Sequence, residues 1–145
     1  MTFQDHFSTQ ASEYARFRPH YPAALFEWLA GISPGRVLVW DCGTGSGQAA
    51  VALAAHFERV VASDPSADQI AHAEPHARVQ YVVGPAEEPP MEARGADLVT
   101  CAQAFHWLDH ARFFPALRVT LRPGGVFAAW GYGLMSISPE VDAVV

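Results

Sequence analysis

The sequence predicts an α/β protein built on a doubly wound, mostly parallel sheet. Short apolar runs, typical of buried strands, alternate along the chain with segments of helical composition. A chain of 145 residues, 50% hydrophobic and 17% charged, is long enough for one domain with a substantial core. Such alternation produces right-handed crossovers onto a parallel sheet with both faces covered.

The first half of the chain supplies two helices and two strands. Residues 22–30 (PAALFEWLA) have helical spacing, and Pro22 suits the first turn of a helix. Residues 36–40 (RVLVW) are a continuous apolar run, which is typical of a strand buried on both faces. Residues 48–57 are rich in alanine and predict a helix, and residues 59–63 (RVVAS) predict the second strand.

The middle of the chain continues the alternation. Ser66 is suited to cap a helix that extends to about Ala73. Strands are expected over 79–83 (VQYVV) and 96–102 (ADLVTCA), and the PAEEPP segment at 85–90 between them is expected to be a loop.

The last predicted elements are a helix, a turn and a strand. Residues 110–121 have helical composition, and Pro115 is expected to kink or split that helix. RPGG at 122–125 is typical of a turn, and residues 126–130 (VFAAW) are expected to form the fifth strand.

The overall charge argues against nucleic acid as a partner. The formal net charge is -6, whereas a protein that binds phosphate backbones normally presents a basic face. No basic-then-apolar leader is visible, and no apolar stretch approaches the roughly 20 residues of a membrane span. We therefore expect a soluble, cytoplasmic protein with no membrane partner.

Gly43, Gly45 and Gly47 follow the first apolar run at alternate positions. Glycines between a strand and a helix let a ligand lie directly on the backbone at the helix N-terminus. Gly45, Gly47 and Ala50 also match the GxGxxA spacing of dinucleotide-binding folds. Asp41, just ahead of the glycines, is poorly placed against a pyrophosphate but well placed against a cationic group such as an ammonium.

Asp64 ends the second strand, about 20 residues beyond the glycines, where a carboxylate can accept the hydroxyls of a ribose. The alternative is a turn or helix-capping aspartate. A ligand with a ribose and an ammonium but no diphosphate is S-adenosylmethionine.

Five segments together resemble one family. Residues 41–47 resemble the DxGxGxG signature of the Rossmann-like S-adenosylmethionine-dependent methyltransferases, residues 84–90 (GPAEEPP) their GxAExLP segment, and residues 121–125 (LRPGG) their LkPGG turn. FRPHYP (17–22) and QAFHW (103–107) are similar to the small-molecule subgroup that includes trans-aconitate methyltransferase-like proteins. The resemblance implies a Rossmann-like fold, S-adenosylmethionine as cofactor and a small-molecule acceptor.

The resemblance also assigns residues to the cofactor. It implies that Asp41 lies near the methionine ammonium, Asp64 near the ribose and Glu87 near the adenine. Arg18 is expected to pair with a carboxylate of the cofactor or of an acidic substrate, and a solvated surface arginine is the alternative. The full expected set is Arg18, Asp41, Gly43, Thr44, Gly45, Gly47, Asp64, Pro65, Gln69, Pro85, Ala86, Glu87, Ala102 and Gln103.

The acceptor side is expected after the fourth strand and in the N-terminal segment. Tyr14 and Tyr21 are expected to form part of a lid, and His106 and Trp107 to line the acceptor. His106 is the candidate catalytic base for a hydroxyl or amine acceptor, whereas a carboxylate acceptor needs no base. The alternative is a hydrogen-bonded histidine beneath a loop.

No metal and no disulfide are expected. His106, Asp109 and His110 resemble a metal cluster, but no further ligand motif lies nearby. The sheet order of the family places Cys42 and Cys101 on neighbouring strands. We expect two small buried thiols, with a redox switch as the alternative.

The chain departs from its relatives after the fifth strand. The relatives continue with a helix and a C-terminal hairpin, whereas this sequence ends at SISPEVDAVV (136–145). We therefore expect one domain with an N-terminal helical lid segment (1–35), a core (36–135) and the start of a truncated C-terminal region (136–145). The fifth strand is then expected to be an exposed apolar edge that favours self-association.

These features together predict a small-molecule methyltransferase that uses S-adenosylmethionine. An oxygen of an acidic metabolite is one candidate acceptor. The alternatives are an NAD(P)-binding oxidoreductase and a non-catalytic fragment that binds S-adenosylmethionine.

Overall fold

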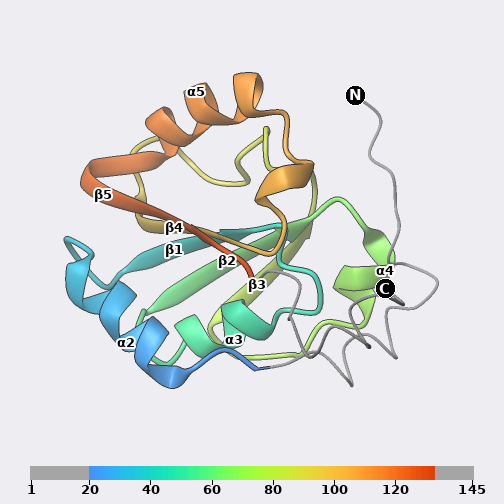
Figure 1. Ribbon diagram of the computed structural model, residues 1–145, viewed down its shortest axis with the longest axis horizontal. Coiled ribbons are helices and arrows are strands. Elements are labelled where there is room, and N and C mark those ends of the chain that lie inside the picture. Colours follow the sequence, from blue (N-terminus) through green and yellow to red (C-terminus); the bar gives the residue numbers. More distant parts are fainter. Residues whose placement is uncertain (1–19, 133–145) are drawn as a thin grey trace, which may run out of the picture.

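A computed structural model describes residues 20–132 and shows a five-stranded sheet in the order β3-β2-β1-β4-β5. All four pairings between neighbouring strands are parallel, so the predicted α/β class is confirmed (Figure 1). The strands are β1 (Leu38–Cys42), β2 (Arg59–Asp64), β3 (Val79–Val83), β4 (Ala96–Ala102) and β5 (Leu121–Trp130).

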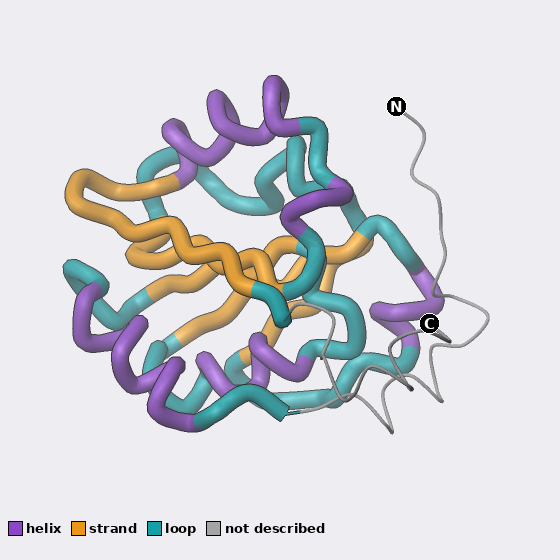
Figure 2. The backbone as a smooth tube through the Cα atoms, in the orientation of Figure 1, coloured by secondary structure: helices purple, strands orange, loops and turns teal. Residues whose placement is uncertain are grey.

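Helices lie on both faces of the sheet, as expected for a doubly wound fold (Figure 2). Helices α2 and α3 cover one face and α5 covers the other, while α4 lies beyond one end of the strands (Figure 1). In residues 20–132 no helix combines the length and apolar character needed to cross a membrane. The helices are α2 (Ala23–Ile32), α3 (Gln48–Leu53), α4 (Ala67–Ala71), the short 3-10 helix η2 (Phe105–Trp107) and α5 (His110–Thr120).

The central strands separate two apolar cores because successive side chains point to opposite faces. Val39 on β1 packs toward α2 and α3, whereas the neighbouring Trp40 packs toward α5. Both side chains are fully buried, and the Trp40 indole N–H donates to Ser63 Oγ at 2.9 Å. Every residue of β4 is buried, as expected for a strand covered on both faces.

Several predicted boundaries change in the structure. β1 begins and ends two residues later than the apolar run at 36–40, which places Asp41 inside the strand. Ser66 caps α4 as predicted, since its Oγ accepts the Gln69 N–H at 3.2 Å. Pro115 does not split the predicted helix, because α5 runs without interruption from His110 to Thr120.

The predicted RPGG turn lies inside a strand. β5 begins at Leu121, but its ladder with β4 is irregular until Val126. Gly124 within this interval has φ of +78°, a conformation that glycine adopts at little cost. The turn residues therefore form a bulge within β5 and do not separate a helix from a strand.

Asp97 joins the amino ends of three strands. Its Oδ2 accepts the N–H groups of Val37 and Leu38 at 2.9 and 3.0 Å, and its Oδ1 accepts Arg122 Nη1 at 2.6 Å. Burial alone would raise the pKa of this carboxyl. The hydrogen bonds from Leu38, Arg122 and Val37 outweigh burial and hold the pKa below its ordinary value.

Replacing Asp97 with asparagine should destabilise the fold by about 1–3 kcal/mol at neutral pH, because charged hydrogen bonds to buried donors are lost. The contribution of the carboxylate is complete above about pH 4, the pKa of an unfolded aspartate, and is lost as the pH falls through the lower folded-state pKa. Urea unfolding at several pH values should therefore show a gap between wild type and Asp97→Asn that narrows below about pH 4. Asp68→Asn, at an exposed position of α4, is the matched control. Equal unfolding free energies at pH 7 would contradict this role.

Candidate functional site

The candidate site is centred on the loop between β1 and α3, at the carboxyl ends of the strands. Gly43, Gly45 and Gly47 have φ of +65°, +58° and +85°, so all three require the left-handed conformation. A Cβ at Gly43 would lie 2.6 Å from the Cβ of Ala104, and a Cβ at Gly47 would overlap the hydroxyl of Tyr81. The loop thus presents bare backbone, as the sequence predicted.

Asp64, at the end of β2, anchors this loop. Its Oδ2 accepts the Gly45 N–H at 2.9 Å, and its Oδ1 accepts the Ser66 N–H at 2.9 Å. The second contact is that of a turn aspartate, which was the alternative to the ribose role. The two roles are compatible, because a carboxylate can accept about four hydrogen bonds.

Asp41 joins the glycine loop to β4. Its carboxylate is 1% exposed and accepts Thr44 Oγ1 at 2.7 Å and Thr100 Oγ1 at 2.6 Å. Thr100 was not among the predicted site residues, although its hydroxyl, in the middle of the mostly apolar run ADLVTCA, was a usable signal. Parallel pairing of β1 with β4 places Thr100 opposite Asp41. The negative charge therefore has a fixed position below the loop.

Tyr81, on β3, is a second site residue that was not predicted from the sequence. Its hydroxyl donates to the Glu74 carbonyl oxygen at 2.5 Å and lies against Gly47. Burial raises the pKa of Tyr81 to about 12, and the nearby charges of Asp41 and Glu74 add to the shift. The phenol therefore stays protonated and acts as a hydrogen-bond donor at neutral pH.

Gln69, on α4, offers an acceptor to a ligand. The residue is 4% exposed, and its Oε1 is buried with no hydrogen-bond partner in the described part of the chain. A buried acceptor without a partner costs about 1–3 kcal/mol. A ligand with an N–H or O–H group, such as the amine of a nucleobase, would remove that cost. The bare glycine loop and this acceptor fit the nucleoside part of S-adenosylmethionine.

The segment after β3 packs beneath the site. Ala86 is buried among the apolar residues on the α5 side of the sheet. Glu87 Oε1 accepts the Asp109 N–H at 2.7 Å and so joins this segment to the start of α5. Pro65 and Pro85 are half-buried on either side of β3. Contacts of these residues with a cofactor stay predictions.

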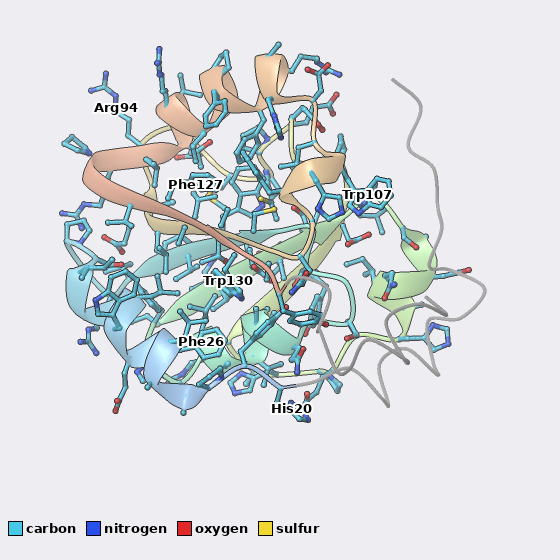
Figure 3. All side chains as sticks on the ribbon, viewed as in Figure 1. His20, Phe26, Arg94, Trp107, Phe127 and Trp130 are labelled. Carbon is cyan, nitrogen blue, oxygen red and sulfur yellow. The ribbon has the colours of Figure 1, made fainter. Side chains whose placement is uncertain are left out.

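The last two cofactor candidates, Ala102 and Gln103, and the acceptor candidates His106 and Trp107 follow one another at the end of β4. Ala102 ends β4 and is 6% exposed, and Gln103 follows it. His106 and Trp107 lie on η2, both exposed, with ring centroids 4.8 Å apart. Trp107 is labelled in Figure 3. The alternative of a histidine buried beneath a loop is wrong, since His106 faces solvent. Its role as a base stays a prediction.

Tyr21 packs on the carboxyl end of β5. Its ring lies edge-on to Trp130 at 5.7 Å and to Phe26 at 6.3 Å between centroids. The other N-terminal candidates, Tyr14 and Arg18, lie outside the described residues. The proposed lid therefore stays a prediction.

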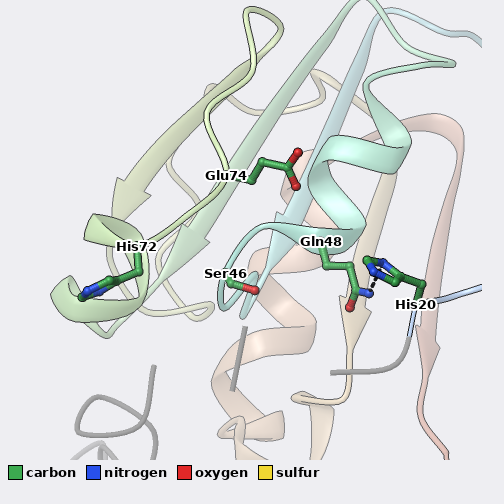
Figure 4. Close-up of a pocket in the computed structure, with 5 residues that line it drawn as sticks. All are labelled: His20, Ser46, Gln48, His72 and Glu74. Atoms are coloured by element: carbon green, nitrogen blue, oxygen red, sulfur yellow. Dashed lines mark hydrogen bonds between the residues drawn. The ribbon is translucent and has the colours of Figure 1, made fainter. Parts of the chain in front are cut away.

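A polar cavity of about 120 Å³ lies on the outer side of the glycine loop (Figure 4). Gln48 Nε2 and His20 Nδ1 are 2.9 Å apart, and the Glu74 N–H donates to the Ser46 carbonyl oxygen at 3.0 Å. In the described part of the chain no three His, Cys, Asp or Glu side chains gather as metal ligands. The lining residues are His20, Ser46, Gln48, His72 and Glu74.

Cys42 and Cys101 are buried free thiols on the paired strands β1 and β4. The hydrogen bond with Cys101 and burial raise the pKa of the Cys42 thiol well above its usual range. Cys42 Sγ also lies 3.3 Å from the Thr100 carbonyl oxygen. Because the reactive thiolate is disfavoured, small buried thiols are the better description.

Comparison with known proteins adds an independent line of evidence. Residues 40–129 match the methyltransferase domain family. A protein assigned as a methyltransferase in Dictyostelium discoideum is 38% identical over 144 residues, covering 99% of this chain and 55% of that protein. The chain spans about half the length of the curated relatives it matches.

Solved structures agree in fold. A protein assigned as a type II methyltransferase from Anaeromyxobacter dehalogenans superposes with a TM-score of 0.80 and 52% identity, covering 88% of this chain and 55% of that chain. The DhpI–SAM–HEP complex superposes with a TM-score of 0.67 and 30% identity, covering 84% of this chain and 60% of that chain.

Gly47→Ala should destabilise the protein by about 1–3 kcal/mol, because alanine is strained at this φ and its methyl group overlaps the Tyr81 hydroxyl. Gly84→Ala is the matched control, since a Cβ there meets no atom within 4 Å. Urea unfolding of both variants checks the difference. If the two alanine variants lose equal stability, the packing of Tyr81 against the loop is not a constraint.

Proposed function

The chain belongs to the Rossmann-like S-adenosylmethionine-dependent methyltransferases, and on that premise we propose that it binds S-adenosylmethionine and transfers its methyl group to a small molecule. The observation that supports this most directly is the left-handed glycine loop flanked by two buried carboxylates, Asp41 and Asp64. Bare backbone suits a close-lying nucleoside, and the two carboxylates suit its hydroxyls and its ammonium group. The DhpI–SAM–HEP complex shares the fold at 30% identity and supports the same cofactor here.

Each flanking residue has a proposed task. Asp64 accepts the ribose hydroxyls in addition to its two backbone N–H groups, and Gln69 Oε1 accepts the adenine amine. Asp41 attracts the methionine ammonium, and hydrogen bonds from Thr44 and Thr100 hold the Asp41 carboxylate in place. The cofactor supplies an electrophilic methyl group on a sulfonium. The protein contributes to the rate by positioning the two reactants and excluding water.

We assign the acceptor to the side of β4 where His106 and Trp107 follow the strand. A hydroxyl or amine acceptor must lose a proton, and the exposed imidazole of His106 can take it. A carboxylate acceptor, such as that of an acidic metabolite, reacts through an oxygen that is already ionised. We place this reaction in the cytoplasm.

Two other functions follow from the same sequence. A dinucleotide-dependent oxidoreductase is disfavoured, because Asp41 lies directly below the loop and would repel a pyrophosphate. A module that binds the cofactor without turnover differs from the proposed enzyme only in methyl transfer. An assay of turnover therefore separates them.

S-adenosylhomocysteine should bind the chain with micromolar affinity in calorimetry. Asp64→Asn should weaken binding at least about tenfold, equivalent to 1.4 kcal/mol, because an amide N–H₂ would face an N–H group of the loop. Glu58→Gln, at an exposed position before β2, is the matched control. Binding of NADH in place of S-adenosylhomocysteine would favour the oxidoreductase.

Methyl transfer should depend on His106 only for acceptors that lose a proton. His106→Ala should slow transfer to phenols on the order of 100-fold and leave transfer to carboxylates within about twofold. Release of S-adenosylhomocysteine with the two acceptor classes measures this, and His56→Ala is the control. Equal loss with both classes would assign His106 a structural role. Absence of turnover with every acceptor, despite cofactor binding, would favour the binding module.

We also propose self-association through β5. It is an edge strand that pairs only with β4 among the described strands. Sedimentation should show an average mass that rises with protein concentration. A constant monomer mass over the micromolar range would contradict this.

A further inference from the structure

Two buried hydrogen-bond donors at the carboxyl end of the sheet have no acceptor in the described part of the chain. Within residues 20–132, Gln103 Nε2 and the indole Nε1 of Trp130 are buried and lack a hydrogen-bond partner. The two residues are neighbours across β4 and β5, since the Gln103 N–H donates to the Trp130 carbonyl oxygen at 2.8 Å. Buried polar groups in folded proteins are almost always paired, so two such donors side by side need an explanation.

The backbone of Gln103 is also strained. Its φ is +60°, and Arg94 is the only other non-glycine residue with a positive φ in the described part of the chain. A glutamine has a Cβ and is therefore disfavoured at this positive φ, whereas glycine adopts it readily. Strain of this kind persists where the surrounding structure enforces it, and it clusters at active sites, ligand-binding residues and switch regions.

The position of the Gln103 amide restricts what can bind it. Its Oε1 lies only 3.1 Å from where a Cβ of Gly131 would be, so the absence of a side chain at Gly131 makes room for the amide. The remaining nitrogen can only donate. The missing partner must therefore be a hydrogen-bond acceptor.

Trp130 supports the same conclusion independently. Its indole packs between Phe26, at 6.1 Å, and Tyr21, at 5.7 Å between ring centroids, and Figure 3 shows Trp130 beside Phe26. The indole nitrogen is a donor and cannot accept. Aromatic surroundings in which Gln103 Nε2 and Trp130 Nε1 are donors unpaired within the described residues suit a ligand that presents oxygen atoms as acceptors.

We propose that Gln103 and Trp130 donate hydrogen bonds to a ligand carboxylate. A carboxylate accepts several hydrogen bonds and donates none, whereas a hydroxyl ligand would bring a donor of its own. The inference rests on the proposed function, which supplies two sources of this group. One is an acidic methyl acceptor and the other is the methionine part of the cofactor.

The test compares three ligands by calorimetry. S-adenosylhomocysteine has the amino-acid end with its carboxylate and ammonium, and 5′-methylthioadenosine is the nucleoside thioether without that end. The third ligand, benzoate or octanoate, is added to protein saturated with S-adenosylhomocysteine. The variants are Gln103→Leu and Trp130→Phe, which remove one donor each. Gln80→Leu, at an exposed position of β3, is the matched control. Melting temperatures check that each variant is folded.

We expect Gln103→Leu to weaken binding of one carboxylate at least about tenfold, with a smaller effect from Trp130→Phe. Weaker binding of S-adenosylhomocysteine but not of methylthioadenosine identifies the carboxylate of the cofactor. Weaker binding of benzoate or octanoate alone identifies the acceptor.

Unchanged affinity for all ligands in both folded variants would overturn the inference and leave these donors to water. Should either variant fail to fold, the other still decides the result. If the wild-type chain binds neither S-adenosylhomocysteine nor 5′-methylthioadenosine, the proposed function itself is contradicted. This result is obtained before any variant is measured, so it is distinct from a failure of the carboxylate inference.

Discussion

The site depends on two carboxylates that hold a left-handed glycine loop at the end of a parallel sheet. Asp64 accepts the Gly45 N–H, and Asp41 accepts the hydroxyl of Thr44. Three left-handed glycines would otherwise leave this segment with great conformational freedom. Asp41 lies on β1 and Asp64 on β2, two almost fully buried strands. Their hydrogen bonds therefore fix the loop to a rigid part of the sheet. In the proposed function the same two groups also contact the cofactor.

The opposite end of the sheet is held by similar chemistry with a different purpose. Asp97 accepts backbone N–H groups from the start of β1 and the guanidinium of Arg122 on β5. Asp97 therefore joins β1, β4 and β5 at the amino end, whereas Asp41 joins β1 to β4 near the carboxyl end. At the amino end all of the Asp97 hydrogen bonds are internal, which is typical of a stabilising group.

The carboxyl end differs because some of its buried polar atoms have no hydrogen-bond partner among residues 20–132. Gln69 offers a carbonyl oxygen, whereas Gln103 and Trp130 offer N–H groups. The acceptor lies toward the proposed adenine, and the two donors lie where the methionine and the methyl acceptor are expected. This distribution of donors and acceptors is what a ligand with a basic nucleoside and an acidic end would require.

Local sequence patterns determined much of the fold. Apolar runs marked the five strands to within a few residues, and the alternation of strands with helices implied parallel pairing. The glycine loop and Asp64 were also visible, because a turn signal and a strand end are local features. Ser66 was found for the same reason, since an N-cap depends on neighbouring residues alone.

Other features required the tertiary structure. Thr100 reaches Asp41 from 59 positions away, and only the pairing of β1 with β4 brings them together. Pro115 is accommodated within α5 against its local preference, and the irregular RPGG segment is placed within β5 because Leu121 already pairs with Ala96. The strained φ of Gln103 has no local signal either. In each case contacts between distant segments outweigh local conformational preferences of about 1–3 kcal/mol per residue. The local sequence pattern reports only those preferences, because the contacts depend on residues far away in the chain.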